Sequence, residues 1–312
     1  MMKKLFVLVL TALTAMTLCC VMASAEQAEN YTYGDLVYTV TENGEAIIVD
    51  CADTVTGEVI IPGDIDDKFV VGIADGAFEG CAALEKVVIG SEVLSIGDRA
   101  FSGCIALETV VFGERVAEIG DHAFNRCEKL NSVVFSARVR EIGEYAFFGC
   151  GALSEIDLSA SVATIGAHAF DSCKSLKTVV LTRNVESVGD FAFNLCTALE
   201  RVTVSSNITF IGENAFRNTN ELKTVIVPAG SYAYSYMDRL SVPFDLLTAD
   251  TDSDGELTNA DISVLVRYLA GFDISDNVGA DFDVMRMDFY TDGKLNNRDV
   301  ICCVQTLAGW DN

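Results

Sequence analysis

The sequence predicts an α/β solenoid of seven 23-residue repeats, with a parallel β-sheet on its concave face, followed by a small all-α domain. Three observations support this fold class. Phenylalanine recurs every 23 residues from Phe78 to Phe216, and each interval contains one strand pattern and one turn pattern. The period stops near Leu247, where an acid-rich motif begins and occurs twice. Seven copies without an insertion indicate stacked coils rather than separate globular units.

Residues 1–25 have the features of an export signal. Residues 3–4 are lysines, residues 5–22 are largely apolar, and residues 23–25 (Ala-Ser-Ala) form a small-x-small cleavage site. An uncleaved anchor or a lipoprotein is the alternative, but no small residue precedes the pair Cys19-Cys20 as lipidation requires. We expect a secreted chain with no other membrane span. The net charge of -25 argues against nucleic acids and anionic membranes as partners.

Residues 26–70 are expected to cap the N-terminal end of the solenoid. Residues 38–61 alternate between apolar and polar types, and Asn43-Gly44 is a strong hairpin signal. A hairpin here would cover the first coil, whose sheet edge otherwise exposes unpaired backbone groups.

Each repeat in residues 71–230 opens with a strand pattern. In the first copy, Leu84, Val87 and Ile89 follow Leu-x-x-Val-x-Ile, which places alternate residues inside the coil. Stacked coils would pair these strands into a parallel sheet with about 4.8 Å between neighbours.

The second half of each repeat is predicted to turn. Val93 and Ile96 form a second apolar pair, and Gly97 marks a turn for which we expect a positive φ. Asp98 is placed where a short helical turn would start and could accept its free N–H groups. Phe101 is then the wedge that fills the coil interior.

One slot of the repeat is a column of cysteines, with Thr219 in the seventh copy: Cys81, Cys104, Cys127, Cys150, Cys173 and Cys196. Disulfides are an open alternative in a secreted chain, but parallel Cβ vectors suit them poorly. A straight column also cannot surround zinc tetrahedrally. We expect buried free thiols; Cys51, Cys302 and Cys303 have no obvious partner by spacing.

Two rows of outward strand residues would form the exposed sheet face. One is Lys86, Thr109, Ser132, Glu155, Thr178, Arg201 and Thr224, and the other is Val88, Val111, Val134, Asp157, Val180, Thr203 and Ile226. This short-chained, half-aliphatic surface is interpreted as a protein-binding strip, although exposed strand positions are often β-branched in any case.

No catalytic constellation is evident. The two histidines, His122 and His168, occupy one variable column two coils apart, about 10 Å, which is too far for a shared metal or proton relay. Tyr145 and Phe191 in the same column suggest an ordinary surface position. We therefore expect that the chain is not an enzyme.

The repeat closely resembles the BspA-like leucine-rich repeats of bacterial surface and secreted proteins. The resemblance covers residues 33–247 and rests on Ile-Gly-Asp-x-Ala-Phe-x-x-Cys-x-x-Leu. Ala74, Val188 and Thr219 are the departures from the pattern. Residues 231–247, a short helix pattern followed by a strand pattern, would close the C-terminal end.

The tail contains two loops with calcium-ligand spacing. The first offers carboxylates at loop positions 1, 3, 5 and 12 and a carbonyl at position 7, from Asp250, Asp252, Asp254, Asp261 and Glu256. The second offers three carboxylates and a carbonyl, from Asp288, Asp292, Asp299 and Lys294, and has Tyr290 at position 3. An acidic linker is the alternative. We expect two Ca²⁺ sites, the second weaker.

Each loop is followed by an apolar helix pattern, and residues 248–312 as a whole resemble a dockerin of type I with EF-hand-like loops. The resemblance implies calcium-dependent docking to a cohesin on a cellulosome-type scaffold. It also implies association with polysaccharide degradation and an anaerobic setting in which thiols stay free. The family's recognition positions correspond to Asn259, Ala260, Asn297 and Arg298.

Together these features predict a secreted, non-catalytic protein-binding module that the tail moors to a scaffold. Two alternatives stay open: an accessory with weak hydrolase activity on polysaccharides, and an adhesin or inhibitor acting on another protein.

Overall fold

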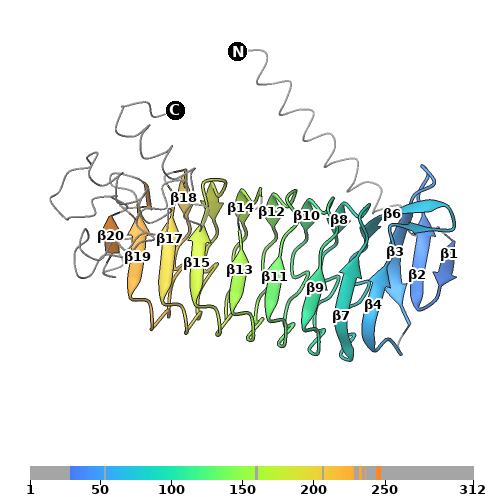
Figure 1. Ribbon diagram of the computed structural model, residues 1–312, viewed down its shortest axis with the longest axis horizontal. Coiled ribbons are helices and arrows are strands. Elements are labelled where there is room, and N and C mark those ends of the chain that lie inside the picture. Colours follow the sequence, from blue (N-terminus) through green and yellow to red (C-terminus); the bar gives the residue numbers. More distant parts are fainter. Residues whose placement is uncertain are drawn as a thin grey trace, which may run out of the picture.

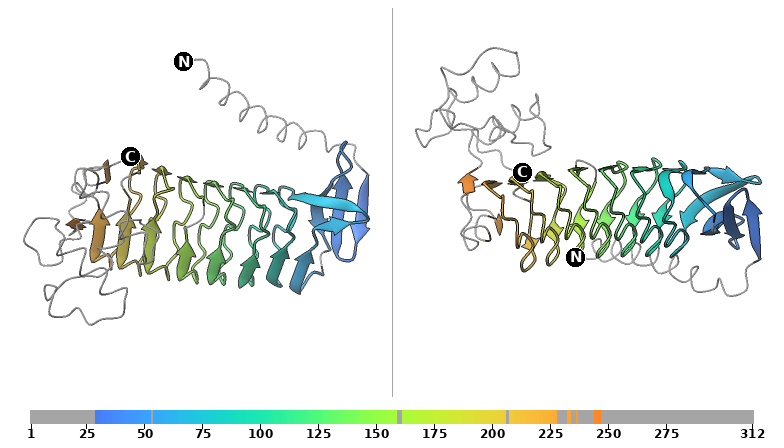
Figure 2. Two further views of the ribbon diagram at one scale, coloured as in Figure 1. Left: turned by 45° about the horizontal axis from the view of Figure 1, so that its top comes forward. Right: turned by 90° about the horizontal axis from the view of Figure 1, so that it is seen from below.

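The computed structural model describes residues 29–227 except 53, 159–160 and 206, and beyond them positions 232, 233, 236 and the backbone of 244–246. The predicted leader and the tail of residues 248–312 lie outside this part. The described coils stack side by side along a nearly straight axis, so the main sheet face is flat rather than concave (Figures 1 and 2).

The main face consists of the predicted parallel strands, one from each coil. Its first sheet contains β4 (Gly57–Ile61), β7 (Leu84–Ile89), β9 (Thr109–Val111), β11 (Ser132–Val134) and β13 (Glu155–Asp157). A second sheet continues the stack with β15 (Thr178–Leu181), β17 (Arg201–Val204), β19 (Thr224–Val227) and β20 (Phe244–Leu246). Neighbouring strands pair in register at the 23-residue period, for example Val110 with Val133.

A second ladder of strands, which the repeat pattern does not predict, forms where the second apolar pair lies. It contains the parallel strands β6 (Lys68–Ile73), β8 (Ser95–Ile96), β10 (Glu118–Ile119), β12 (Glu141–Ile142), β14 (Thr164–Ile165), β16 (Ser187–Val188) and β18 (Phe210–Ile211). Each coil after the cap contributes only two residues to it. Such short segments show little sequence alternation, and their pairing depends on the stacking itself.

An antiparallel cap covers the N-terminal end, as expected. It is built from β1 (Asn30–Tyr33), β2 (Leu36–Val40), β3 (Ala46–Cys51) and the short β5 (Asp64–Ile65). The β2–β3 turn contains Gly44 with φ of 80°, in agreement with the Asn43-Gly44 hairpin prediction. Strand β3 then pairs in parallel with β6, which joins the cap to the solenoid.

The repeated phenylalanine is the centre of the core, which confirms its predicted role as a wedge. Successive rings stack with centroids 4.9 to 5.4 Å apart: Phe78, Phe101, Phe124, Phe147, Phe170, Phe193 and Phe216. The first six are at most 1% exposed. One stack therefore connects every coil to the next with both dispersion and aromatic contacts.

The turn half of the repeat corrects two expectations. The described repeats contain turns but no α-helix, so they form a β-solenoid rather than an α/β one. Gly97 and its equivalents do not have positive φ. They are glycines because the coils touch there: a Cβ on Gly143 would lie 2.6 Å from the carbonyl carbon of Gly120.

The acid that follows the glycine also acts between coils rather than within one. Asp98 Oδ1 accepts the N–H of Asp121 at 2.8 Å, and Asp121 Oδ1 accepts the N–H of Glu144 at 2.7 Å. These carboxylates hold a backbone ladder together instead of capping a helix. Positive φ occurs one residue later, in the column that includes His122 and Tyr145.

Candidate functional site

The outward face of the main sheet exposes a row of aliphatic side chains, here named the aliphatic strip: Ile60, Val88, Val111 and Val134. Strand register places these four on consecutive strands. Ile60 is 63% exposed and Val134 is 67% exposed, values that are high for aliphatic side chains within a sheet. The strip ends at Asp157, and further along the same row Thr203 is buried.

The neighbouring outward row is polar and short. Thr109 and Ser132 flank the strip, and Lys86 pairs with Glu58 at 2.9 Å. Both predicted rows therefore face outward along the first coils, as expected. The resulting surface is flat, with an apolar centre and a polar border, which is the layout of many protein-binding surfaces.

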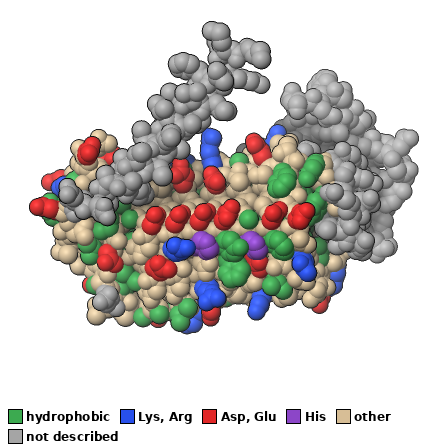
Figure 3. All heavy atoms as spheres, turned by 180° about the vertical axis from the view of Figure 1, so that it is seen from behind, with side chains coloured by type: hydrophobic (Ala, Val, Ile, Leu, Met, Phe, Trp, Pro, Cys, Tyr) green, Lys and Arg blue, Asp and Glu red, His purple; other side chains and the backbone are tan. Residues whose placement is uncertain are grey.

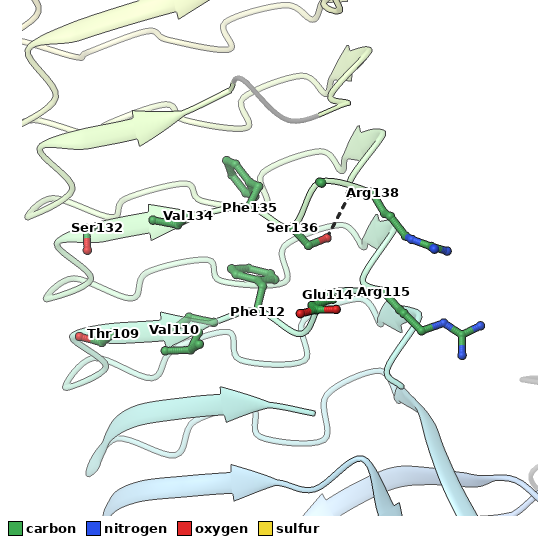
Figure 4. A pocket seen from close by; sticks show the side chains of 12 residues that line it. Thr109, Val110, Phe112, Glu114, Arg115, Ser132, Val134, Phe135, Ser136 and Arg138 are labelled. Carbon is green, nitrogen blue, oxygen red and sulfur yellow. Dashed lines mark hydrogen bonds between the residues drawn. The ribbon is translucent and has the colours of Figure 1, made fainter. Parts of the chain in front are cut away.

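A hollow of about 600 Å³ opens beside the strip, where β9 and β11 end (Figure 4). Val111 and Val134 lie on one side, and Phe112 and Phe135 form its floor with ring centroids 5.9 Å apart. Phe135 is buried, whereas Phe112 is only partly buried. No other described coil has phenylalanine at this slot, and the rings distinguish this site from the rest of the face.

Two arginines stand at the mouth of the hollow, on the loops that follow the strands (Figure 4). Arg115 forms an ion pair with Glu92. The guanidinium of Arg138 forms no ion pair or hydrogen bond with any residue that the structure describes. The hollow thus has an apolar floor and, among its lining residues, the guanidinium of Arg138, which could pair with an acidic group of a partner.

The cysteine column is a set of buried thiols in five of its six positions. Cys104 Sγ donates to the Phe78 carbonyl at 3.1 Å, and the next four copies repeat this bond at 3.2 to 3.4 Å. Burial raises the pKa of Cys104 to about 12 and also raises the pKa of the deeper members. These thiols are therefore packing groups and not nucleophiles.

The first position differs from the expectation. Cys51, which has no partner by spacing, lies in the cap with its Sγ 3.0 Å from Cys81 Sγ. Cys81 is also partly exposed rather than buried. The cap does not share the 23-residue period, so sequence spacing could not reveal this contact.

A second column forms an aromatic row that sequence reasoning treated as an ordinary surface. His122, Tyr145, His168 and Phe191 stack with centroids 4.8, 4.5 and 4.9 Å apart. His168 Nδ1 lies 2.8 Å from the buried Asp171 carboxylate. Figure 3 shows the two histidines beside a row of acidic side chains. Tyr145 separates the histidines, so they do not meet at one metal or proton relay.

Comparison with known proteins agrees with this architecture. The family model described as "BspA type Leucine rich repeat region" matches residues 71–178 and 117–239, in 6 copies. The chain belongs to the BspA-type leucine-rich repeat family. No curated protein matches it.

Several solved structures are similar to this chain. The T. pallidum leucine-rich repeat protein is 28% identical with a TM-score of 0.58, over 70% of this chain and 98% of that one. A leucine-rich repeat protein from Bacteroides ovatus is 26% identical with a TM-score of 0.48, over 64% of this chain and 59% of that one. The pneumococcal vaccine antigen PcpA is 22% identical with a TM-score of 0.44, over 65% and 51% of the two chains.

The predicted calcium ligands and cohesin-facing residues lie outside the described part of this BspA-type protein. They are Asp250, Asp252, Asp254, Glu256, Asp261, Asp288, Asp292, Lys294 and Asp299, together with Asn259, Ala260, Asn297 and Arg298. Within the described residues, no three metal-ligating side chains gather in one place. No helix among those residues is long and apolar enough to span a membrane.

Proposed function

We propose that the protein is a non-catalytic, extracellular binding module whose BspA-type repeats grip another protein through the aliphatic strip and the adjoining hollow. The supporting observation is that Ile60, Val111 and Val134 are exposed on one flat sheet face, beside a floor of two aromatic rings. Contiguous exposed apolar surface on a soluble protein is typical of an interaction site. In protein interfaces, a few central side chains that bury apolar surface in a pocket supply most of the binding free energy.

The test of the strip uses a charge placed on its most exposed member. Val134→Asp should leave the fold intact, because the side chain is 67% exposed. It should lower the yield of chemical cross-links to extracellular partner proteins at least 10-fold. Asn220→Asp is the matched control, since it adds the same charge at an exposed position far along the solenoid. Equal capture of the same partners by both variants would remove the strip from the binding surface.

For the tail, the proposal is that residues 248–312 form a calcium-dependent dockerin that moors the repeats to a cohesin of a cellulosome-like scaffold. The two loops with calcium-ligand spacing support it. Pull-down of the full chain by cohesins should succeed with Ca²⁺ and fail with chelator or with Asp254→Ala. Val134→Asp should have no effect on this interaction. Cohesin capture that survives chelation would refute the docking proposal and leave the strip proposal untouched.

The alternatives predict other outcomes. A hydrolase accessory would release reducing ends from plant polysaccharides, and two placed carboxylates in a cleft would be needed for that chemistry. An adhesin or inhibitor would bind its target without any scaffold. Incubating the full chain with soluble polysaccharides and measuring reducing ends separates the first alternative from binding alone.

A further inference from the structure

The thiol pair Cys51 and Cys81 differs from every other described cysteine. Five column members donate to a phenylalanine carbonyl of the preceding coil, 26 residues earlier in the chain. Cys81 has no full coil before it and instead has Cys51 Sγ as its hydrogen-bonding partner at 3.0 Å. A disulfide has an S–S distance of about 2.0 Å, so a side-chain approach of about 1 Å would join the two atoms.

The pair also bridges two parts of the architecture. Cys51 is the last residue of β3 in the antiparallel cap. Cys81 lies in the turn that leads into β7 of the first repeat. The backbone also links the cap to the solenoid, through the β3–β6 and β5–β6 pairings and through hydrogen bonds such as Ala74 N–H to the Ile48 carbonyl at 2.8 Å. A covalent bond here would add a side-chain link to these backbone links.

Access separates this pair from the column as well. Cys104, Cys127 and the members beyond them are 0% exposed, so a reagent cannot reach them without unfolding a coil. Cys81 is partly exposed and Cys51 is 8% exposed. Cys81 is therefore the thiol that an oxidant reaches first. Desolvation raises the pKa of Cys51, so Cys51 is the less reactive thiol of the pair.

We propose that Cys51 and Cys81 form a disulfide that ties the N-terminal cap to the first coil, while the rest of the described column stays as thiols. The oxidant is a disulfide donor. The Cys81 thiolate attacks one donor sulfur, forms a mixed disulfide and releases one donor thiol. Cys51 then attacks Cys81 Sγ and releases the second donor thiol. Two electrons pass from the cysteines to the donor, and their two protons end on the released thiols.

The bond would act at the end of the solenoid, where a stack of coils is weakest. A terminal coil contacts only one neighbour, so unfolding can begin there and propagate. Joining positions 51 and 81 closes a loop of about 30 residues, which restricts the unfolded cap.

The test treats the folded full chain with oxidised glutathione. Because the assay itself supplies the oxidant, its result does not depend on the cellular location of the protein. Trypsin cleaves after Lys68 and Lys86, so Cys51 and Cys81 fall in different peptides. After denaturation and alkylation, mass spectrometry should find those two peptides linked and Cys104 alkylated. The melting temperature should exceed that of the dithiothreitol-treated protein by about 5–10 °C.

Two serine variants make the result specific. Cys81→Ser should yield no linked peptide and no rise in melting temperature with oxidised glutathione. Cys104→Ser, the matched column control, should retain both. The absence of the Cys51–Cys81 peptide in the oxidised wild-type chain would overturn the proposal. A linked peptide without any rise in melting temperature would overturn the role in tying the cap.

Discussion

Gly143→Ala tests the claim that the repeated glycine is required by contact between coils and not by its φ. An ideal Cβ at Gly143 would lie 2.6 Å from the Gly120 carbonyl carbon and 2.7 Å from Asp121 Oδ1. Ordinary contact begins at 3.4 Å, so the coils would have to separate by about 0.8 Å at this point. That movement strains the bond from Gly143 N–H to the Ile119 carbonyl, now 2.9 Å.

The expected cost follows from overpacking against backbone that cannot rotate away. We expect Gly143→Ala to lower the free energy of unfolding by about 3 kcal/mol and the melting temperature by about 6–12 °C. Urea unfolding measures the first quantity. Hydrogen exchange should show faster exchange at Ile119 and Ile142, where β10 and β12 pair.

Gly151→Ala is the matched control, since the nearest atom to its added Cβ is 4.0 Å away and its φ is not positive. It should be neutral or stabilise the fold by up to about 1 kcal/mol. If both variants are equally stable, close approach between coils is not the reason for the repeated glycine.

Three further predictions concern the core, the thiols and the tail. Phe147→Ala should lower the free energy of unfolding by about 4 kcal/mol, because the ring is 0% exposed and stacks on its neighbours with centroids 5.2 and 5.3 Å away. Phe210→Ala, at a 50% exposed position, should lower it by under about 0.5 kcal/mol in the same urea assay. Burial raises the pKa of Cys104 from 9.0 to about 12. The contribution of the neutral Cys104 thiol to the free energy of unfolding is therefore complete below pH 9 and is lost as the pH rises through 12. Urea midpoints should fall over that range, and less steeply in Cys104→Ala. Calorimetric titration of the full chain with Ca²⁺ should resolve two unequal sites, since Tyr290 replaces a ligand in the second loop; two equally tight sites would contradict the ligand assignment.

The repeat pattern was a reliable guide wherever the relevant contact repeats with it. Inward residues such as Val87 and Phe101 were identified correctly because period and alternation are local properties of the chain. The hairpin at Asn43-Gly44 was predictable for the same reason, since the turn chemistry is contained in two residues.

Pattern reasoning failed where the cause lies in the neighbouring coil. A glycine in a turn predicts a positive φ at Gly97, whereas the structure shows that its Cα lies too close to the backbone of Ala74, 23 residues earlier, for a side chain. Asp98 was assigned to a helix start, but its acceptor role is towards Asp121 of the next coil. The sequence places His122 and Tyr145 in one column and suggests an ordinary surface position, whereas in the structure their rings stack into an aromatic row.

The sequence by itself determined the coil length and the inward-facing set, because each is a regularity along one chain, while the calcium sites of the tail stay a prediction. The tertiary structure alone decided that the turns are helix-free, that a two-residue ladder forms a second sheet, and that Cys51 meets Cys81. These features arise from distances between coils or between the cap and a coil. The sequence period gives the order of the coils, whereas these distances depend on how their backbones and side chains pack against one another.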